Sequence, residues 1–215
     1  MRAGARRRRP GRVYAIADAG RIAARRLPEA VAAMAAAGIE TIQLRAKELA
    51  DRELWRLAEA TLARLEGWPG TLWIDDRVDL AAVLPFDGVH LGQHDLPPRS
   101  ARPQLAVTTA IGWSTHDEAQ LAAADGDPDV DWIAIGPVFA TTSKANADRE
   151  LGLERLARLR ARTAKPLVAI GGIDATRLGA VLACGVDGAA LIAAVCDGDV
   201  PANCRRLLAA ARSAS

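Results

Sequence analysis

The sequence predicts a single α/β domain in which eight parallel strands alternate with helices and close into a TIM barrel. Three observations favour this fold. The chain has 215 residues, and 50% of them are hydrophobic, which suits one sizeable core. Its short strand-like segments are apolar on both faces, as in a parallel sheet covered by helices. Eight strand–helix pairs in about 200 residues close most naturally into a barrel, with a doubly wound open sheet as the alternative.

Strand-like and helix-like segments alternate through the N-terminal half. The strands are expected at 13–17, 41–45, 71–75 and 88–92. The helices between them are expected at 28–38, within 51–67, and at 78–84. Pro28 suits the first turn of a helix and Gly38 its C-terminal end. In the second helix, six residues fall on one face, namely Leu54, Leu57, Ala58, Thr61, Leu62 and Leu65.

The same alternation continues in the C-terminal half. The remaining strands are expected at 106–112, 132–136, 166–172 and 188–194. Their helices are expected at about 115–124, within 151–162, within 174–185 and at 200–213. No composition shift interrupts this series, so one domain accounts for residues 13–215.

Positive charge is concentrated at the start of the chain. The formal net charge is +2, and six arginines lie in the first twelve residues, so the remainder is net negative. Arginine-rich arms bind nucleic acid in some proteins, but here no aromatic residue interleaves with the run and no basic helix follows it. We expect residues 1–12 to form a basic, disordered extension and residues 13–215 to form the catalytic barrel.

The remaining composition favours a soluble cytoplasmic protein. Cys184, Cys196 and Cys204 are widely spaced without a CxxC pattern, which argues against a disulfide framework or a zinc site. No apolar run is long enough for a membrane span, and the apolar segment after the arginines has only five residues before Asp18.

Polar side chains gather where the predicted strands end, which is the active face of a TIM barrel. Gln43, Arg45 and Lys47 are spaced two apart, so all three side chains point to one face of an extended segment. A polar row with two cations on a strand that should face a packed interior is hard to explain as structure. It indicates an anion site, because arginine supplies a planar fork and lysine a point charge for phosphate oxygens.

Two carboxylates follow neighbouring strands, Asp76 after the third and Asp95 after the fourth. The C-terminal ends of adjacent parallel strands meet at one rim, so these acids are expected to lie close together. Oxygen ligands of this kind favour Mg²⁺ held against a substrate phosphate. The alternative is structural: Asp95 caps the helix that begins near Leu96, and Asp76 pairs with Arg77.

Later strand ends add further candidates. Ser114 could bind substrate or cap the next helix, whereas capping or surface exposure is favoured for His116. Hydroxyls and a lysine suited to a phosphate follow the sixth strand at Thr141, Thr142, Ser143 and Lys144. The last two strands end at glycines and at short backbone turns, which form the usual phosphate site of this fold: Gly171, Gly172, Ile192 and Ala193.

Seven motifs resemble, in order and spacing, those of the thiamine-phosphate synthase family. They read TIQLRAKE, IDDRVDLA, DGVHLGQHDL, IGWSTH, WIAIGPVFATTSK followed by LGLE, VAIGGI and GVDGAALIAAV. The resemblance covers nearly everything from Val13 to Ala194. It implies an enzyme that joins a hydroxymethylpyrimidine diphosphate to a thiazole phosphate and releases pyrophosphate with Mg²⁺. The expected partners are these two small molecules, with no nucleic acid or membrane, and a homo-oligomer is possible.

The resemblance also implies roles for individual residues. The pyrimidine diphosphate would be held by Gln43, Arg45, Lys47, Ser114 and Lys144. Asp76 and Asp95 would hold Mg²⁺, with Asp75 beside them. The thiazole phosphate would be held by Thr141, Thr142, Ser143, Gly172 and the backbone at Ile192 and Ala193. Two positions depart from the family, since Asp75 stands where Asn is usual and Ala193 where Ser is usual.

Two other functions were weighed. A thiazole tautomerase shares this barrel but needs neither metal-binding acids nor cations for a diphosphate, so Asp76, Asp95, Lys47 and Lys144 argue against it. A non-catalytic ligand-binding barrel, or a nucleic-acid binder that uses the arginine run, is not excluded by the fold alone. The predicted rim contains no obvious Cys–His or Ser–His pair, which fits a reaction driven by electrostatic stabilisation of a leaving group.

Overall fold

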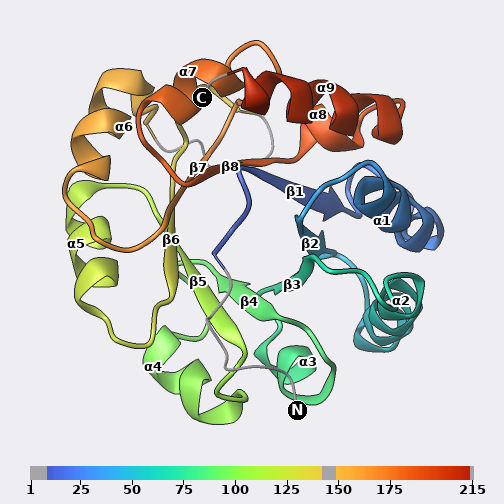
Figure 1. Ribbon diagram of the computed structural model, residues 1–215. Coiled ribbons are helices and arrows are strands. Elements are labelled where there is room, and N and C mark those ends of the chain that lie inside the picture. The colour runs from blue at the N-terminus through green and yellow to red at the C-terminus, as the bar shows by residue number, and fades with distance from the viewer. Residues whose placement is uncertain (1–8, 142–148, 214–215) are drawn as a thin grey trace.

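The protein is a closed barrel of eight parallel strands surrounded by helices (Figure 1). The computed structural model describes residues 9–141 and 149–213. Neighbouring strands pair in chain order, and the last strand pairs with the first through Val13 and Ala189. This closure confirms the predicted TIM barrel. The open-sheet alternative is wrong, because an open sheet lacks the pairing between its first and last strands.

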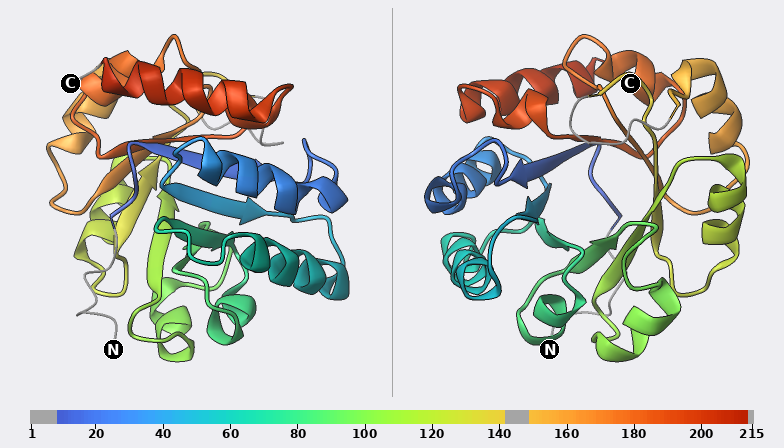
Figure 2. Two further views of the ribbon diagram at one scale, coloured as in Figure 1. Left: turned by 45° about the vertical axis from the view of Figure 1, so that its right-hand side comes forward. Right: turned by 180° about the vertical axis from the view of Figure 1, so that it is seen from behind.

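The helices lie outside the strands in every view (Figure 2). The strands are β1 (Val13–Asp18), β2 (Thr41–Arg45), β3 (Thr71–Asp75), β4 (Gly88–Leu91), β5 (Ala110–Thr115), β6 (Trp132–Ile135), β7 (Leu167–Ile170) and β8 (Gly188–Leu191). The helices are α1 (Leu27–Ala36), α2 (Asp51–Arg64), α3 (Val78–Val83), α4 (Pro98–Ala101), α5 (Glu118–Gly126), α6 (Gly152–Arg160), α7 (Leu178–Ala183), α8 (Ala193–Cys196) and α9 (Val200–Arg212). Two 3₁₀ turns, η1 (Ala24–Arg26) and η2 (Arg102–Gln104), complete the described elements.

The largest error in the predicted boundaries is at β5. A strand was expected at 106–112, but β5 covers Ala110–Thr115, because the Thr109 N–H donates to the Ala106 carbonyl and closes a turn before the strand. The following helix then starts at Glu118, where Asp117 accepts a hydrogen bond from the Gln120 N–H at 2.8 Å. Asp117 is therefore the cap, and the capping role considered for Ser114 is wrong.

The interior of the barrel is filled by an aromatic cluster. Tyr14, Trp73 and Trp132 are fully buried, and the ring of Trp132 lies 5.4 Å from each of the other two ring centroids. Glycines on the neighbouring strands make room for the indoles. A Cβ atom at Gly88 would lie 2.2 Å from the Trp73 ring, and one at Gly112 would lie 2.4 Å from the Trp132 ring. This packed layer forms an apolar floor beneath the mouth of the barrel.

Residues 9–12 contact the opposite, N-terminal end of the barrel. Pro10 is buried, and the Gly11 N–H donates to Thr41 Oγ1 at 2.8 Å. The Arg12 carbonyl accepts a hydrogen bond from the Ala189 N–H at 3.0 Å. These contacts join residues 9–12 to the barrel, and the rest of the predicted basic extension lies outside the described residues.

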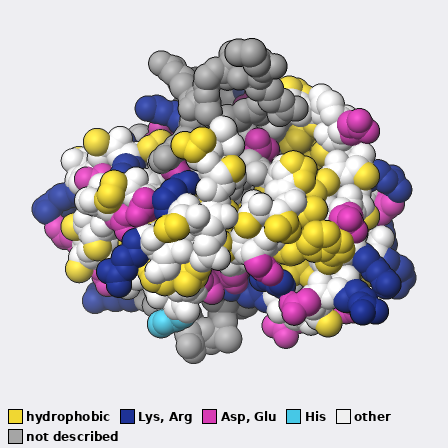
Figure 3. Space-filling view, turned by 90° about the horizontal axis from the view of Figure 1, so that it is seen from below, with side chains coloured by type: hydrophobic (Ala, Val, Ile, Leu, Met, Phe, Trp, Pro, Cys, Tyr) yellow, Lys and Arg dark blue, Asp and Glu magenta, His cyan; other side chains and the backbone are white. Residues whose placement is uncertain are grey.

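Basic and acidic side chains are intermixed on the face seen in Figure 3. Many of the described charges are paired, as where Arg77 contacts both Asp51 and Asp79. The three cysteines form no disulfide. Among the described residues, no helix combines the length and apolar character that crossing a membrane requires.

Candidate active site

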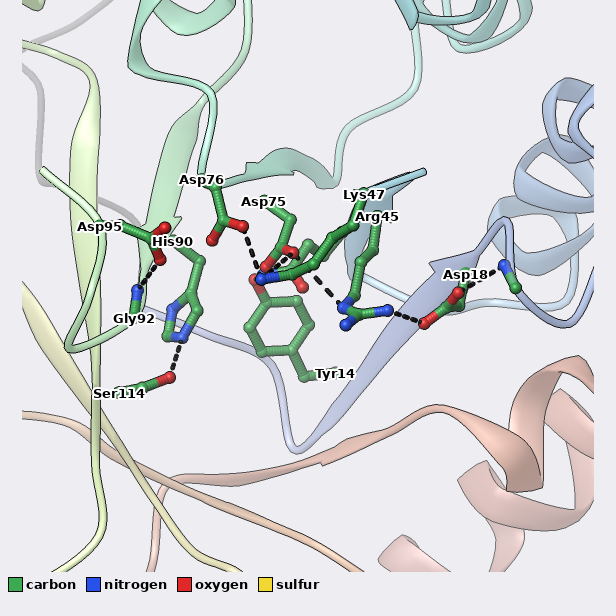
Figure 4. Close-up of polar contacts among 12 residues, drawn as sticks. Tyr14, Asp18, Arg45, Lys47, Asp75, Asp76, His90, Gly92, Asp95 and Ser114 are labelled. Atoms are coloured by element: carbon green, nitrogen blue, oxygen red, sulfur yellow. Dashed lines mark hydrogen bonds and ion pairs between the residues drawn. The ribbon is translucent and has the colours of Figure 1, made fainter. Parts of the chain in front are cut away.

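The predicted polar residues converge at the C-terminal mouth of the barrel, above the aromatic floor (Figure 4). They line a cavity of about 80 Å³ that opens between the strand ends. Its walls include seven of the residues predicted from the sequence: Gln43, Arg45, Lys47, Asp75, Asp76, Ser114 and Ile192. The same cavity is lined by buried residues that the sequence analysis did not single out, among them Tyr14, His90 and Trp132.

The polar row of β2 and the residues after it, Gln43, Arg45 and Lys47, reaches this cavity. Strand alternation places every second side chain on the inner face. Gln43 is buried, and its Nε2 donates to the Tyr14 hydroxyl at 3.0 Å. Arg45 forms an ion pair with Asp18 at the end of β1. Lys47 Nζ lies 2.6 Å from Asp76. Burial lowers the pKa of Lys47, but its hydrogen bond to Asp76 and the charge of Asp75 more than compensate and raise it above the ordinary value.

Asp75 and Asp76 both face the mouth, although adjacent strand residues normally point to opposite faces (Figure 4). The backbone explains this, because Asp76 has φ 61° and is the one non-glycine residue of the described chain in the left-handed region. Aspartate tolerates that conformation better than most residues. Lys47 Nζ consequently lies 3.8 Å from Asp75 as well as 2.6 Å from Asp76.

Among the described residues, the acidic side of the site holds more carboxylates than there are cations to pair with them. Burial, followed by the neighbouring Asp76, raises the pKa of Asp75 to about 7. Oδ2 of Asp75 accepts no hydrogen bond from a described residue, although Arg45 Nε lies 3.4 Å away. Burial and the nearby Asp95 also raise the pKa of Asp76, against the effect of Lys47. Crowded carboxylates of this kind fit a site for an added cation.

Asp95 completes this acidic group from the loop after β4. It lies close enough to Asp76 to raise the pKa of that carboxyl, and its Oδ2 accepts from the Gly92 N–H at 2.7 Å. The helix-capping alternative for Asp95 is wrong, because α4 starts without a side-chain cap. The pairing of Asp76 with Arg77 is also wrong, because Arg77 pairs with Asp51 and Asp79. No group of three or more His, Cys, Asp or Glu within the described ranges could hold a metal alone. Two carboxylates fit Mg²⁺ when substrate oxygens complete its ligand shell.

Ser114 lies in β5 and is paired with His90 of β4, which the sequence analysis missed. His90 Nε2 lies 2.8 Å from Ser114 Oγ, and the imidazole stacks on Trp132 at 4.8 Å. The expectation that the rim contains no Ser–His pair is therefore wrong. It failed because the register of β4 and β5 sets His90 opposite Gly112, two residues before Ser114. His116, for which capping or exposure was favoured, lies 2.8 Å from the Gly136 carbonyl through Nδ1.

The opposite side of the mouth is built from backbone and small residues. Gly171 and Gly172 have φ of 105° and 62°, and a Cβ at Gly172 would lie 2.4 Å from the Ala140 carbonyl oxygen. Thr141, Gly172 and Ala193 line one cavity of about 560 Å³. Thr142, Ser143 and Lys144, which were predicted to bind phosphate here, lie outside the described residues.

The fold and this mouth define a class of protein, namely TIM-barrel enzymes that act on phosphorylated small molecules. The family model for thiamine monophosphate synthase matches residues 13–195. The chain therefore belongs to the thiamine-phosphate synthase family, whose members are transferases.

Individual relatives agree with this assignment over most of their length. The thiamine-phosphate synthase of Moorella thermoacetica is 41% identical over 182 residues, which cover 83% of this chain and 85% of the relative. The thiamine-phosphate synthase of Syntrophomonas wolfei is 38% identical over 197 residues, which cover 91% of this chain and 93% of the relative. Among solved structures, the thiamine phosphate pyrophosphorylase of Pyrococcus furiosus has a TM-score of 0.84 and 30% identity, covering 94% of this chain and 96% of its own.

Proposed function

We propose that this chain condenses a hydroxymethylpyrimidine diphosphate with a thiazole phosphate to give thiamine phosphate and pyrophosphate, in an Mg²⁺-dependent reaction. The observation that carries the proposal is the meeting of Arg45 and Lys47 with Asp76 and Asp95 at one rim of the barrel. Cations suit the diphosphate, and the acids suit the ion that accompanies it. A thiazole tautomerase uses neither group, so the site favours the synthase.

The diphosphate is assigned to the side of the mouth formed by β2, β3 and β5. Without substrate, Lys47 and Arg45 are neutralised by Asp76 and Asp18. Asp76 and Asp95 would hold Mg²⁺, which neutralises charge on the leaving pyrophosphate when it is bound. Lys47 and Arg45 then exchange their carboxylate partners for phosphate oxygens. Ser114, oriented by His90, adds a hydroxyl donor, and Lys144 is assigned to the same group from the loop after β6.

The proposed chemistry needs stabilisation of charge and no side-chain nucleophile. The bond between the exocyclic methylene and the diphosphate oxygen breaks, and its electron pair leaves with pyrophosphate. The electron-rich aminopyrimidine supports the resulting carbocation. The thiazole nitrogen then supplies an electron pair and forms the new carbon–nitrogen bond. Arg45, Lys47 and Lys144 act where negative charge develops, which is the most effective place for preorganised electrostatics.

The apolar floor suits the organic part of this substrate. Tyr14 and Trp132 present buried aromatic surface directly below the cations, and the Gln43 amide is fixed among them by its bond to Tyr14. We assign the pyrimidine ring to this floor, with Gln43 as its polar contact. Water is excluded from such a layer, which strengthens the electrostatic interactions above it.

The thiazole phosphate is assigned to the other side of the mouth. Thr141, Thr142, Ser143, Gly172 and the backbone at Ile192 and Ala193 are its proposed contacts. The N–H groups of Gly172 and Ile173 donate to none of the described residues, so they remain available to an anion. Ala193 contributes through its backbone, and the absence of a hydroxyl at this position is therefore a mild change.

The test is a product assay with both substrates and Mg²⁺. The proposal expects thiamine phosphate, identified by mass, and pyrophosphate in equal amounts. Isomerisation of the thiazole phosphate without release of pyrophosphate would instead identify a tautomerase. Binding of both ligands without any turnover would identify a non-catalytic barrel.

A further inference from the structure

The cavity beside β7 and β8 extends beyond the strand ends as far as the last helix. Its volume is about 560 Å³, which exceeds what a phosphate group alone requires. One wall is the loop region already assigned to phosphate, with Thr141, Gly172 and Ala193. The lining also carries charged side chains, with Arg21 after β1 and Arg206 on α9 beside Asp174 and Asp197. No motif singled out in the sequence includes either arginine.

The two arginines differ in what neutralises them. Arg21 Nη1 donates to both oxygens of Asp197, at 2.8 and 3.0 Å, so its charge is already matched. Asp174, the other acid that lines the cavity, accepts three hydrogen bonds from its own turn, two of them from Thr176. Arg206 forms no ion pair with any described residue. Asp174 keeps its negative charge, but its own turn holds the carboxylate through Oδ1, so Arg206 is the lining cation whose guanidinium is not engaged by a described carboxylate.

Arg206 is oriented by a hydrogen bond on its own helix. Its Nη2 donates to Oδ1 of Asn203 at 2.8 Å, one helical turn earlier on α9. Asn203 is buried, and its amide donates to the carbonyls of Val195 and Asp197 at 3.2 and 2.8 Å. One of the five N–H groups of the guanidinium is used in this way, and the others donate to no described residue. The Arg206 side chain is exposed, so these remaining donors are accessible to phosphate oxygens.

We propose that Arg206 is a specificity-determining residue that binds the phosphate monoester of the thiazole substrate, and that Asn203 positions it. This inference rests on the proposed function. A phosphate monoester carries a charge of about −1.5 to −2 at neutral pH. The glycine and threonine contacts offer only neutral dipoles, whereas Arg206 adds a full positive charge to the lining of the same cavity. The enzyme thereby distinguishes the phosphorylated thiazole from its alcohol.

The test compares Arg206→Gln with Arg205→Gln, its exposed neighbour on α9, which does not line the cavity. Removing one charged hydrogen bond should raise the KM for the thiazole phosphate about 10- to 100-fold. The KM for the pyrimidine diphosphate should not move. Turnover of the unphosphorylated thiazole alcohol, supplied at high concentration, should be equal in the two variants. Arg206→Lys should fall between wild type and Arg206→Gln.

Asn203→Ala tests the positioning role. It should raise the KM for the thiazole phosphate and leave kcat within about twofold of wild type, because the chemistry occurs at the other side of the mouth. Loss of the bonds to Val195 and Asp197 should lower the melting temperature in either case, whereas a purely structural role would raise the KM of both substrates. That result would overturn the role of Asn203.

Failure of the inference is separable from failure of the proposed function. If wild type makes thiamine phosphate and Arg206→Gln has the same KM for thiazole phosphate as Arg205→Gln, the inference is overturned. If wild type makes no product, the proposed function fails, and calorimetric binding of thiazole phosphate decides the role of Arg206. Weaker binding by Arg206→Gln than by Arg205→Gln would support it, and equal or absent binding would overturn it.

Discussion

The two sides of the barrel mouth are built by different means. The side formed by β2, β3 and the loop after β4 is made of charged side chains, with Arg45, Lys47, Asp75 and Asp76 in mutual contact. The side formed by the ends of β7 and β8 is made mainly of backbone and small residues, with Gly172 allowing close approach and Arg206 of α9 lining the same cavity. The first suits a diphosphate with its metal ion, and the second suits a phosphate monoester. Substitutions should therefore affect the two substrates separately.

The largest expected effect is on the charged side. Asp76→Ala and Asp95→Ala should each lose roughly 2–4 kcal/mol of transition-state stabilisation, because each removes one preorganised electrostatic group. The measurement is kcat/KM with saturating Mg²⁺, and Glu59→Gln on the exposed face of α2 is the control. The account is contradicted if either variant stays within threefold of that control.

Gly172→Ala tests the backbone side, with Gly152→Ala as its matched control. Both positions have positive φ, so backbone strain alone should lower the free energy of unfolding by roughly 1–2 kcal/mol in each variant, and the clash at Gly172 should add to that loss. Only at Gly172 does the new Cβ meet backbone, at 2.4 Å from the Ala140 carbonyl, whereas nothing lies within 4 Å at Gly152. Gly172→Ala should therefore raise the KM for thiazole phosphate alone. Equal KM values in the two variants would show that this backbone does not contact substrate.

Asp75→Asn sharpens the description of the charged side. Asp75 faces the mouth, so its carboxylate opposes a diphosphate unless a cation lies close by. The variant should remain active and should shift, by a few-fold, the Mg²⁺ concentration for half-maximal rate or the KM for the pyrimidine diphosphate. If neither constant moves, Asp75 does not act on the bound diphosphate. Complete loss of activity would indicate a direct role for this carboxylate.

The smallest effect concerns the turn after β7. Hydrogen bonds from Thr176, and then from the Arg177 backbone, lower the pKa of Asp174. A carboxyl whose pKa is lower in the folded than in the unfolded protein stabilises the fold at pH values above its unfolded-state pKa. This stabilisation is lost as the pH falls through the folded-state pKa. Asp174→Ala should cost roughly 1 kcal/mol at pH 7, as for a lost cap. Thermal unfolding should show this difference shrinking below about pH 4. A difference independent of pH would assign the effect to packing instead of charge.

The sequence predicts the architecture well because strand–helix alternation is a local signal that repeats eight times. The shift of β5 shows where such signals fail. The segment from Ala106 to Thr109 contains β-prone residues, yet a backbone hydrogen bond closes it into a turn. The β propensity of individual residues does not indicate a competing backbone hydrogen bond of this kind.

Part of the site was predictable because polar side chains at two-residue spacing are unexpected on a buried strand. Gln43, Arg45 and Lys47 gave that signal, and they share one cavity. His90 gave none, since a single histidine in an apolar strand usually belongs to the core. Its pairing with Ser114 depends on the register of two strands, which single-sequence reasoning does not supply. The left-handed backbone of Asp76, which turns both acids to the mouth, was equally hidden.

The central claim is that the charged side of the mouth acts on a diphosphate together with Mg²⁺. The most direct measurement is the rate of pyrophosphate release from the two substrates before chelation, after EDTA treatment, and after Mg²⁺ is restored. We predict rapid release, near-complete loss with EDTA, and recovery with Mg²⁺ in wild type but not in Asp76→Ala. Full activity of the wild-type enzyme after chelation would contradict it.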